Sequence, residues 1–314
     1  MTRAILRTEI PVTDGDRQTV RKMLEDTRFA RSYRASGDIA ALRAATARMI
    51  GNPFFRPQPE GVTVAAGTLG GVGGEWITPP DAKEAALVFF HGGGYVRGSL
   101  DLGRANASEI ALGTGCRVFM PAYAQAPEHP FPAALEDAVA VAAALGGSGA
   151  RFGLIGESCG GGMALATAMT LRDAGRPAPF AVSCISPFVD LTLSGDSWDF
   201  NDGKDIATRA MGADMIGLYL GEAEASDWRA SPVFGAFHDL PPVHFIVGGS
   251  EGLLSEALTA AERAAEAGGP VTLDIFALMP HGFTKYQFDA ATEAMARVTR
   301  WLAAQASATE ETTA

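Results

Sequence analysis

From residue 62 onward, apolar and polar positions in this chain follow two alternating patterns. Short, nearly continuous apolar runs, typical of strands covered on both faces, are separated by longer segments with helical spacing. The expected strands are 62–66, 75–78, 85–90, 116–120, 151–155, 180–185, 243–247 and 271–276. The expected helices are about 101–113, 132–146, 159–174, 254–267 and 288–305. This order predicts an α/β fold with a mostly parallel, eight-stranded sheet flanked by helices.

Two segments depart from this alternation. Residues 15–50 have a helical pattern, with Asp38 at the start and Gly51 at the end of the second half. Residues 187–235 interrupt the later part of the chain and contain a helix-like stretch at 207–220. An insertion of that length in a compact fold is typical of a lid or a binding element.

Composition and charge narrow the class of protein. Of 314 residues, 47% are apolar and 19% charged, which suffices for a large core. The net charge of −11 argues against nucleic acid or an anionic membrane as a partner. The three cysteines lack metal-ligand spacing and suggest a reducing compartment. The first residues lack the apolar region of a signal peptide, and no apolar run is long enough to span a membrane. We therefore expect a soluble, cytoplasmic protein.

The strongest candidate nucleophile is Ser158, in the G-x-S-x-G pattern of 156–160. It follows a buried-strand pattern and precedes a long helix of small residues, which is the setting of a nucleophile elbow. The pattern recurs around Ser250, also between a strand and a helix. Only one strand is expected after Ser250, too few to supply an acid and a base from later strand ends. We therefore favour Ser158.

The sequence His-Gly-Gly-Gly at 91–94 comes directly after the expected strand 85–90. Acyl transfer needs backbone N–H groups aimed at an oxyanion, and glycines let the backbone approach that closely. The alternative is a glycine-rich loop that binds nothing. We expect His91 to fix this loop by hydrogen bonding rather than to act as a base.

His281 is the expected general base, because it lies between the last strand and the last helix, on the same sheet edge as Ser158. The remaining histidines lie in a proline-rich turn, in a loop before a strand, or inside an apolar run: His129, His238 and His244. The acid should lie between serine and histidine in the chain. Glu251 is the first carboxylate beyond strand 243–247, while Glu256 and Asp190 remain alternatives.

Four motifs together resemble those of the hormone-sensitive-lipase-like esterases, a bacterial group of α/β-hydrolases. They are HGGG at 91–94, GESCGG at 156–161, YAQAPEHPFPAALEDA at 123–138 and PHGF at 280–283, and the resemblance covers nearly the whole chain. It implies an α/β-hydrolase fold without a cofactor, with cap helices from residues 1–50 and an insertion at about 187–225. The catalytic domain would then be 51–314. It also implies a homodimer paired through the edge of the last strand.

Carried over by position, the resemblance implies a triad of Ser158, Glu251 and His281. The oxyanion donors would be the amides of Gly93, Gly94 and Cys159. Three places depart from the family pattern. Glu157 and Cys159 replace Asp and Ala beside the serine, Ala124-Gln125 replaces Arg-Leu, and the acid motif reads Glu-Gly-Leu instead of Asp-Pro-Leu. Glutamate can still orient the imidazole. We expect Cys159 to supply only its amide, and Glu157 to form a structural ion pair under the elbow.

The expected activity is hydrolysis of short- to medium-chain carboxylic esters through an acyl-enzyme. Lactone hydrolysis would use the same site. A small-molecule receptor, like the plant gibberellin receptors that resemble this family, is the alternative from another class, and the intact His281 favours an enzyme. Candidate substrate-binding residues, for which ordinary packing is the competing interpretation, are Phe29, Tyr33, Tyr95, Trp198, Phe200, Met211, Tyr219 and Phe283.

Overall fold

One mixed sheet crosses the whole molecule in the computed structural model, which describes residues 4–26, 38–50 and 54–308. Within these residues the strand order is β1-β9-β8-β7-β6-β4-β5-β3-β2. The strands are β1 (Leu6–Ile10), β2 (Thr63–Leu69), β3 (Val72–Thr78), β4 (Ala86–Phe90), β5 (Arg117–Pro121), β6 (Phe152–Glu157), β7 (Val182–Ile185), β8 (Val243–Gly248) and β9 (Val271–Phe276). Only β2–β3 and β3–β5 pair antiparallel. The mostly parallel sheet expected from the apolar runs is thereby confirmed.

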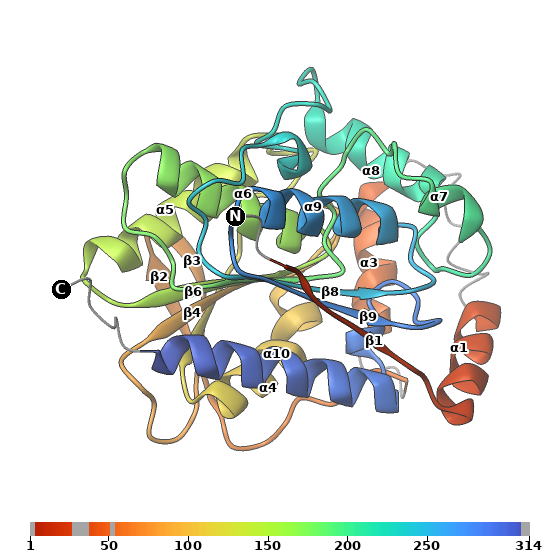
Figure 1. Cartoon of the computed structure of the whole chain (residues 1–314), viewed down its shortest axis with the longest axis horizontal. Helices are drawn as coiled ribbons and strands as arrows, with labels where there is room; N and C mark the ends of the chain where they lie inside the picture. The colour runs from red at the N-terminus through yellow and green to blue at the C-terminus, as the bar shows by residue number, and fades with distance from the viewer. Residues whose placement is uncertain (1–3, 27–37, 51–53, 309–314) are drawn as a thin grey trace.

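Helices cover both faces of the sheet (Figure 1). On one face lie α5 (Ala133–Gly147), α6 (Cys159–Asp173) and α9 (Leu254–Glu266), and on the other lie α4 (Leu100–Thr114) and α10 (Asp289–Ser307). Side chains of β4 alternate between the two resulting cores: Val88 and Phe90 pack in one, Leu87 and Phe89 in the other. All four are fully buried. Burial on both faces explains why this strand is a continuous apolar run.

The ninth strand, β1, was not predicted from the sequence. Its five residues, LRTEI, are mostly exposed, and Leu6 is 66% exposed, so no apolar run marks the strand. It pairs in parallel with β9, from Leu6 opposite Thr272 to Ile10 opposite Phe276. The sheet therefore has nine strands where eight were predicted, and the additional strand is β1 at the edge. The edge of β9 that the family resemblance implied for a homodimer is paired within the chain, and the homodimer stays a prediction.

The N-terminal region divides between the sheet, the core and the cap. Helix α1 (Asp14–Asp26) is attached to α10, a helix that covers the sheet. The Asp16 carboxylate accepts hydrogen bonds from the amides of Asp289 and Ala290 at the start of α10 (2.9 and 3.2 Å). Helix α3 (Ile39–Met49) reaches the active-site end, where Arg43 donates to the carbonyl oxygens of Val96 and Ala126. Residues 1–50 are thus not cap alone. Phe29 and Tyr33 lie outside the described residues.

The predicted insertion contains two helices, α7 (Ser197–Phe200) and α8 (Arg209–Leu220). They lie at the same end of the molecule as α3 (Figure 1). The described residues also form the short 3₁₀ helices η2 (Pro232–Phe234) and η3 (Phe283–Lys285). No helix in the described part of the chain is long and apolar enough to cross a membrane.

Strand β6 and helix α6 meet so closely that side chains are excluded at the junction. A Cβ atom on Gly156 would lie 1.8 Å from the Gly160 carbonyl oxygen, and one on Gly160 would lie 2.1 Å from the Phe90 carbonyl oxygen. Both obstacles are backbone atoms, which cannot rotate away. These two glycines therefore fix where the strand ends and the helix begins.

We predict that Gly160→Ala destabilises the protein by at least about 3 kcal/mol, the upper part of the range for overpacking a core. Gly217→Ala is the matched control, because a Cβ there, inside α8, meets no atom within 4 Å. That variant should be neutral or stabilised by up to about 1 kcal/mol. Urea unfolding of both variants measures the difference, and equal midpoints would contradict this packing account.

Candidate active site

Ser158 lies between β6 and α6 in a strained backbone conformation. Its φ of 56° and ψ of −125° fall outside the regions that residues with a Cβ normally occupy. The Ser158 amide donates to the Ile185 carbonyl oxygen (2.9 Å), and its carbonyl oxygen accepts from Gly161 and Phe188. These bonds and the close glycine contacts hold the strained turn. The hydroxyl is thereby presented at the carboxyl edge of the sheet, beside the N-terminus of α6.

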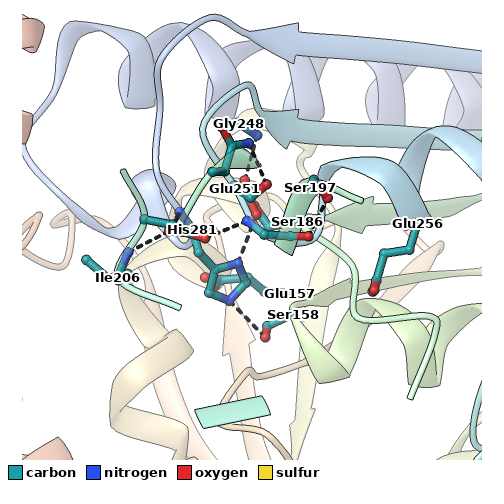
Figure 2. A network of polar contacts seen from close by, with 12 residues as sticks. Glu157, Ser158, Ser186, Ser197, Ile206, Gly248, Glu251, Glu256 and His281 are labelled. Carbon is teal, nitrogen blue, oxygen red and sulfur yellow. Dashed lines mark hydrogen bonds and ion pairs between the residues drawn. The ribbon is translucent and has the colours of Figure 1, made fainter. Parts of the chain in front are cut away.

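The structure brings Ser158, His281 and Glu251 into one hydrogen-bonded row (Figure 2). His281 Nε2 lies 3.0 Å from Ser158 Oγ, and His281 Nδ1 lies 2.9 Å from Glu251 Oε2. A carboxylate can only accept, so Nδ1 carries the proton and Nε2 is left as an acceptor for the serine proton. The arrangement is that of a nucleophile, a base and an orienting acid.

Hydrogen bonds to the other carboxylate oxygen of Glu251 hold its side chain in place. Its Oε1 accepts from the Ser186 hydroxyl (2.6 Å) and from the Gly248 amide (2.5 Å), and the side chain is fully buried. Glu256 and Asp190 are held elsewhere. Glu256 accepts from the Val189 amide, and Asp190 accepts from Thr192 and Ser194. Of the three candidate carboxylates, only Glu251 is hydrogen-bonded to His281.

Asp205, from the predicted insertion, also supports this row. Its two carboxylate oxygens accept from the amides of His281 (2.7 Å) and Gly252 (2.8 Å), so one side chain links the base loop to the acid loop. Burial raises its pKa to about 6. Asp205 was not predicted, because it lies in a polar segment, 201-NDGKD-205, without a motif.

Opposing influences act on the pKa of His281. Burial acts to lower it, but the hydrogen bond that His281 donates to Glu251 and the charges of Glu251 and Asp205 outweigh burial and raise it above its ordinary value. The other histidines are not in this site. The His91 ring contacts the Gly92 carbonyl oxygen and the Tyr123 hydroxyl, as expected for a residue that fixes its loop, and burial lowers its pKa to about 4. His244 pairs with Asp274 in the core.

The glycine loop passes directly beside the serine. A Cβ atom on Gly92 would lie 3.2 Å from Ser158 Cβ. Gly93 and Gly94 have φ values of 132° and 62°, and a Cβ on Gly93 would lie 2.3 Å from the Gly98 amide nitrogen, so glycine is required there. The amides of Gly93, Gly94 and Cys159 therefore belong to the two segments that flank Ser158 Oγ.

Cys159 joins these two segments through its side chain. Its fully buried Sγ accepts from the Tyr95 amide (3.3 Å), and the Tyr95 hydroxyl donates to the Cys159 carbonyl oxygen (3.0 Å). Burial raises the pKa of the thiol, which keeps it protonated and unreactive. The thiol thus packs under the loop.

The ion pair expected for Glu157 is present. The fully buried carboxylate pairs with Lys285 Nζ, from the short helix η3 that follows His281. Asn106 Nδ2 lies 3.5 Å from the second carboxylate oxygen. The pair therefore ties the elbow to the segment that carries the base.

A cavity of about 130 Å³ opens onto Ser158 and His281. Of the candidate substrate-binding residues, Trp198 and Met211 line it. Tyr95 does not, because its ring is buried against Tyr219 with centroids 3.8 Å apart. Phe283 is buried against Phe276, and Phe200 is 53% exposed. The further lining residues, which sequence patterns did not identify, include Thr46, Phe55, Arg97, Leu102, Ile206, Met215 and Tyr286.

In the described part of the chain, no group of three or more His, Cys, Asp or Glu side chains is arranged so that it could hold a metal ion.

The sheet order, the elbow and the row of serine, histidine and carboxylate define an α/β-hydrolase. A family model described as "alpha/beta hydrolase fold" matches residues 87–285. An acetyl-hydrolase from Streptomyces hygroscopicus is 37% identical over 68% of this chain and 73% of its own length. A carboxylesterase from Mycobacterium tuberculosis is 29% identical over 92% of this chain and 96% of its own.

Solved structures agree. A crystal structure of an esterase from the bacterial hormone-sensitive lipase family superimposes with a TM-score of 0.86 at 32% identity, covering 93% of this chain and 99% of that one. The chain therefore belongs to the hormone-sensitive-lipase-like carboxylic ester hydrolases of the α/β-hydrolase family.

We predict that Glu251→Gln lowers kcat by about 10⁴-fold, as the equivalent change does in a serine protease triad. His281 acts as a base only when neutral, so activity rises with pH through its pKa. Glu251 raises this pKa, and its loss should move the acidic limb of the pH profile to lower pH.

The pH dependence of kcat/KM for both proteins measures this shift. Glu262→Gln is the matched control, because it removes the same charge from an exposed position on α9. An acidic limb at the same pH in wild type and Glu251→Gln would contradict the assignment of the acid.

Proposed function

We propose that the chain hydrolyses short- to medium-chain carboxylic esters through an acyl-enzyme on Ser158. The observation that carries the proposal is the unbroken contact from Ser158 Oγ through His281 to the buried Glu251. This intact base supports an enzyme over a receptor with a broken triad.

In the proposed acylation, Ser158 Oγ attacks the ester carbonyl carbon while His281 Nε2 takes the serine proton. Negative charge develops on the carbonyl oxygen. The amides of Gly93, Gly94 and Cys159 donate to this oxygen, and the N-terminus of α6 adds a favourable dipole. Glu251 holds the Nδ1 proton and stabilises the imidazolium. His281 then returns the proton to the leaving alcohol, and the carbon–oxygen bond to that alcohol breaks.

In the proposed deacylation, water takes the place of the alcohol. His281 removes a proton from the water, the resulting hydroxide attacks the acyl carbon, and a second oxyanion uses the same three amides. Collapse of this intermediate breaks the bond to Ser158 Oγ, which regains its proton from His281. The products are a carboxylic acid and an alcohol, and the enzyme is unchanged.

The size of the cavity supports short acyl groups. At about 130 Å³ it is smaller than the roughly 300–1,000 Å³ of pockets that enclose drug-sized ligands. Trp198, Met211 and Met215 from the insertion limit it on the cap side. One of the matching crystals was soaked with p-nitrophenyl butyrate, an ester whose acyl group has four carbons. For location we propose the cytoplasm, which the three free, buried cysteines support.

We predict that kcat/KM for a p-nitrophenyl ester series peaks at or below about six to eight carbons, since the cavity cannot enclose a longer chain. Lactones measured beside this series test the competing substrate class.

Ser158→Ala should lower kcat by at least about 10⁴-fold. Ser250→Ala, in the second G-x-S-x-G, is the matched control and should retain activity. Wild-type activity in Ser158→Ala, or kcat/KM still rising at twelve carbons, would contradict the proposal.

A further inference from the structure

Arg97 extends from the glycine loop into the candidate active site. Its amide donates to the Gly93 carbonyl oxygen (3.0 Å), which holds the residue in the turn that follows the proposed oxyanion donors. Its side chain lines the cavity that contains Ser158 and His281. Arg97 also lines a neighbouring groove of about 740 Å³, with Arg43 and Thr46 of α3. Arg97 thus lines both the cavity and this groove.

The charge of this guanidinium is not balanced within the described residues. Lys285, the other cation of the cavity, pairs with Glu157, and Arg43 in the groove pairs with Glu128. Arg97 forms no such ion pair in the described ranges, and its buried Nε has no hydrogen-bond partner there. The stretches 27–37 and 51–53 contain no Asp or Glu that could supply one.

Arg97 is partly buried, and an unpaired cation in such a place is unfavourable, because it loses part of its hydration without gaining a partner. Arginine cannot escape this cost by losing its proton. Burial lowers the pKa of Arg97 from its ordinary value, while the neighbouring Tyr286 phenol and Cys159 thiol raise it, and an arginine side chain stays charged in proteins. The site therefore favours an anion. Tyr286 lines the same cavity and offers a neutral donor beside the guanidinium.

The planar fork of a guanidinium fits a carboxylate through two parallel hydrogen bonds. We propose that Arg97 binds a carboxylate carried by the substrate, so that the preferred substrates are small acidic esters. This inference rests on the proposed ester hydrolysis at Ser158. The carboxylate lies either on the acyl side, as in a monoester of a short dicarboxylic acid, or on the alcohol side, as in an acyl ester of a short hydroxy acid.

Two pairs of substrates separate these sources. The first pair tests the acyl side: monomethyl glutarate carries a carboxylate where methyl 4-carbamoylbutanoate carries an amide. The second pair tests the alcohol side: acetoxyacetate carries a carboxylate where acetoxyacetamide carries an amide. Acid release in a pH-stat gives kcat/KM for each. We expect wild type to favour the carboxylate by about tenfold or more in at least one pair, as for hydrogen bonds between charged groups.

In Arg97→Met this ratio should fall to about one or below. Arg97→Lys keeps the charge without the fork and should retain an intermediate ratio. Arg176→Met is the matched control, an exposed arginine beyond the end of α6 that should leave the ratio as in wild type.

A wild-type ratio of one in both pairs, or a ratio that is the same in wild type and Arg97→Met, would overturn the proposal. If Arg97→Met does not fold, Arg97→Lys takes its place, and a carboxylate-to-amide ratio of kcat/KM equal to that of wild type would overturn the proposal. The amide substrates distinguish this failure from failure of the proposed function. An enzyme that hydrolyses the amide-bearing esters without preferring the acidic ones refutes only the role of Arg97, while loss of all ester hydrolysis refutes the function itself.

Discussion

The backbone turn at Ser158 is the constraint on which the rest of the site depends. Its φ and ψ are unfavourable for a residue with a side chain, and the turn persists only because β6, β4 and α6 pack within contact distance of one another. Gly156 and Gly160 permit that approach. The strained turn holds the serine hydroxyl within hydrogen-bonding distance of His281 Nε2. Stability of the central sheet thus supports a locally unfavourable geometry at the reacting atom.

Three loops at the carboxyl edge of the sheet converge on this serine, and polar contacts buried between them set their positions. Asp205 joins the base loop to the acid loop, and the Glu157–Lys285 pair joins the elbow to the segment after His281. The Cys159 thiol and Tyr95 join the elbow to the glycine loop. Each contact bridges segments far apart in sequence. The row of Ser158, His281 and Glu251 is therefore held by side chains that do not themselves take part in the proposed chemistry.

The sheet and the serine, histidine and acid row could be predicted because each leaves a local pattern. Buried parallel strands are continuous apolar runs, and elbows and oxyanion loops require glycines at fixed spacing. The edge strand β1 could not be predicted, since its residues face solvent and its strand conformation comes only from pairing with β9. The substrate-binding role predicted for aromatic residues near the motifs failed for a related reason. Tyr95 and Phe283 are adjacent to site residues in sequence, but the local backbone directs both rings into the core. Asp205 and Arg97 carry no motif, and only the folded chain shows what their charges face.

The central claim is that Ser158, and no other nucleophile of this chain, attacks the acyl carbon. Labelling the wild-type protein with a fluorophosphonate and mapping the adduct by peptide mass spectrometry tests it most directly, because such reagents react with a serine activated by a neighbouring base. The account predicts one adduct per chain, on Ser158, with Ser250 and Cys159 unmodified. An adduct on another residue, or a folded protein that is not labelled, would contradict it.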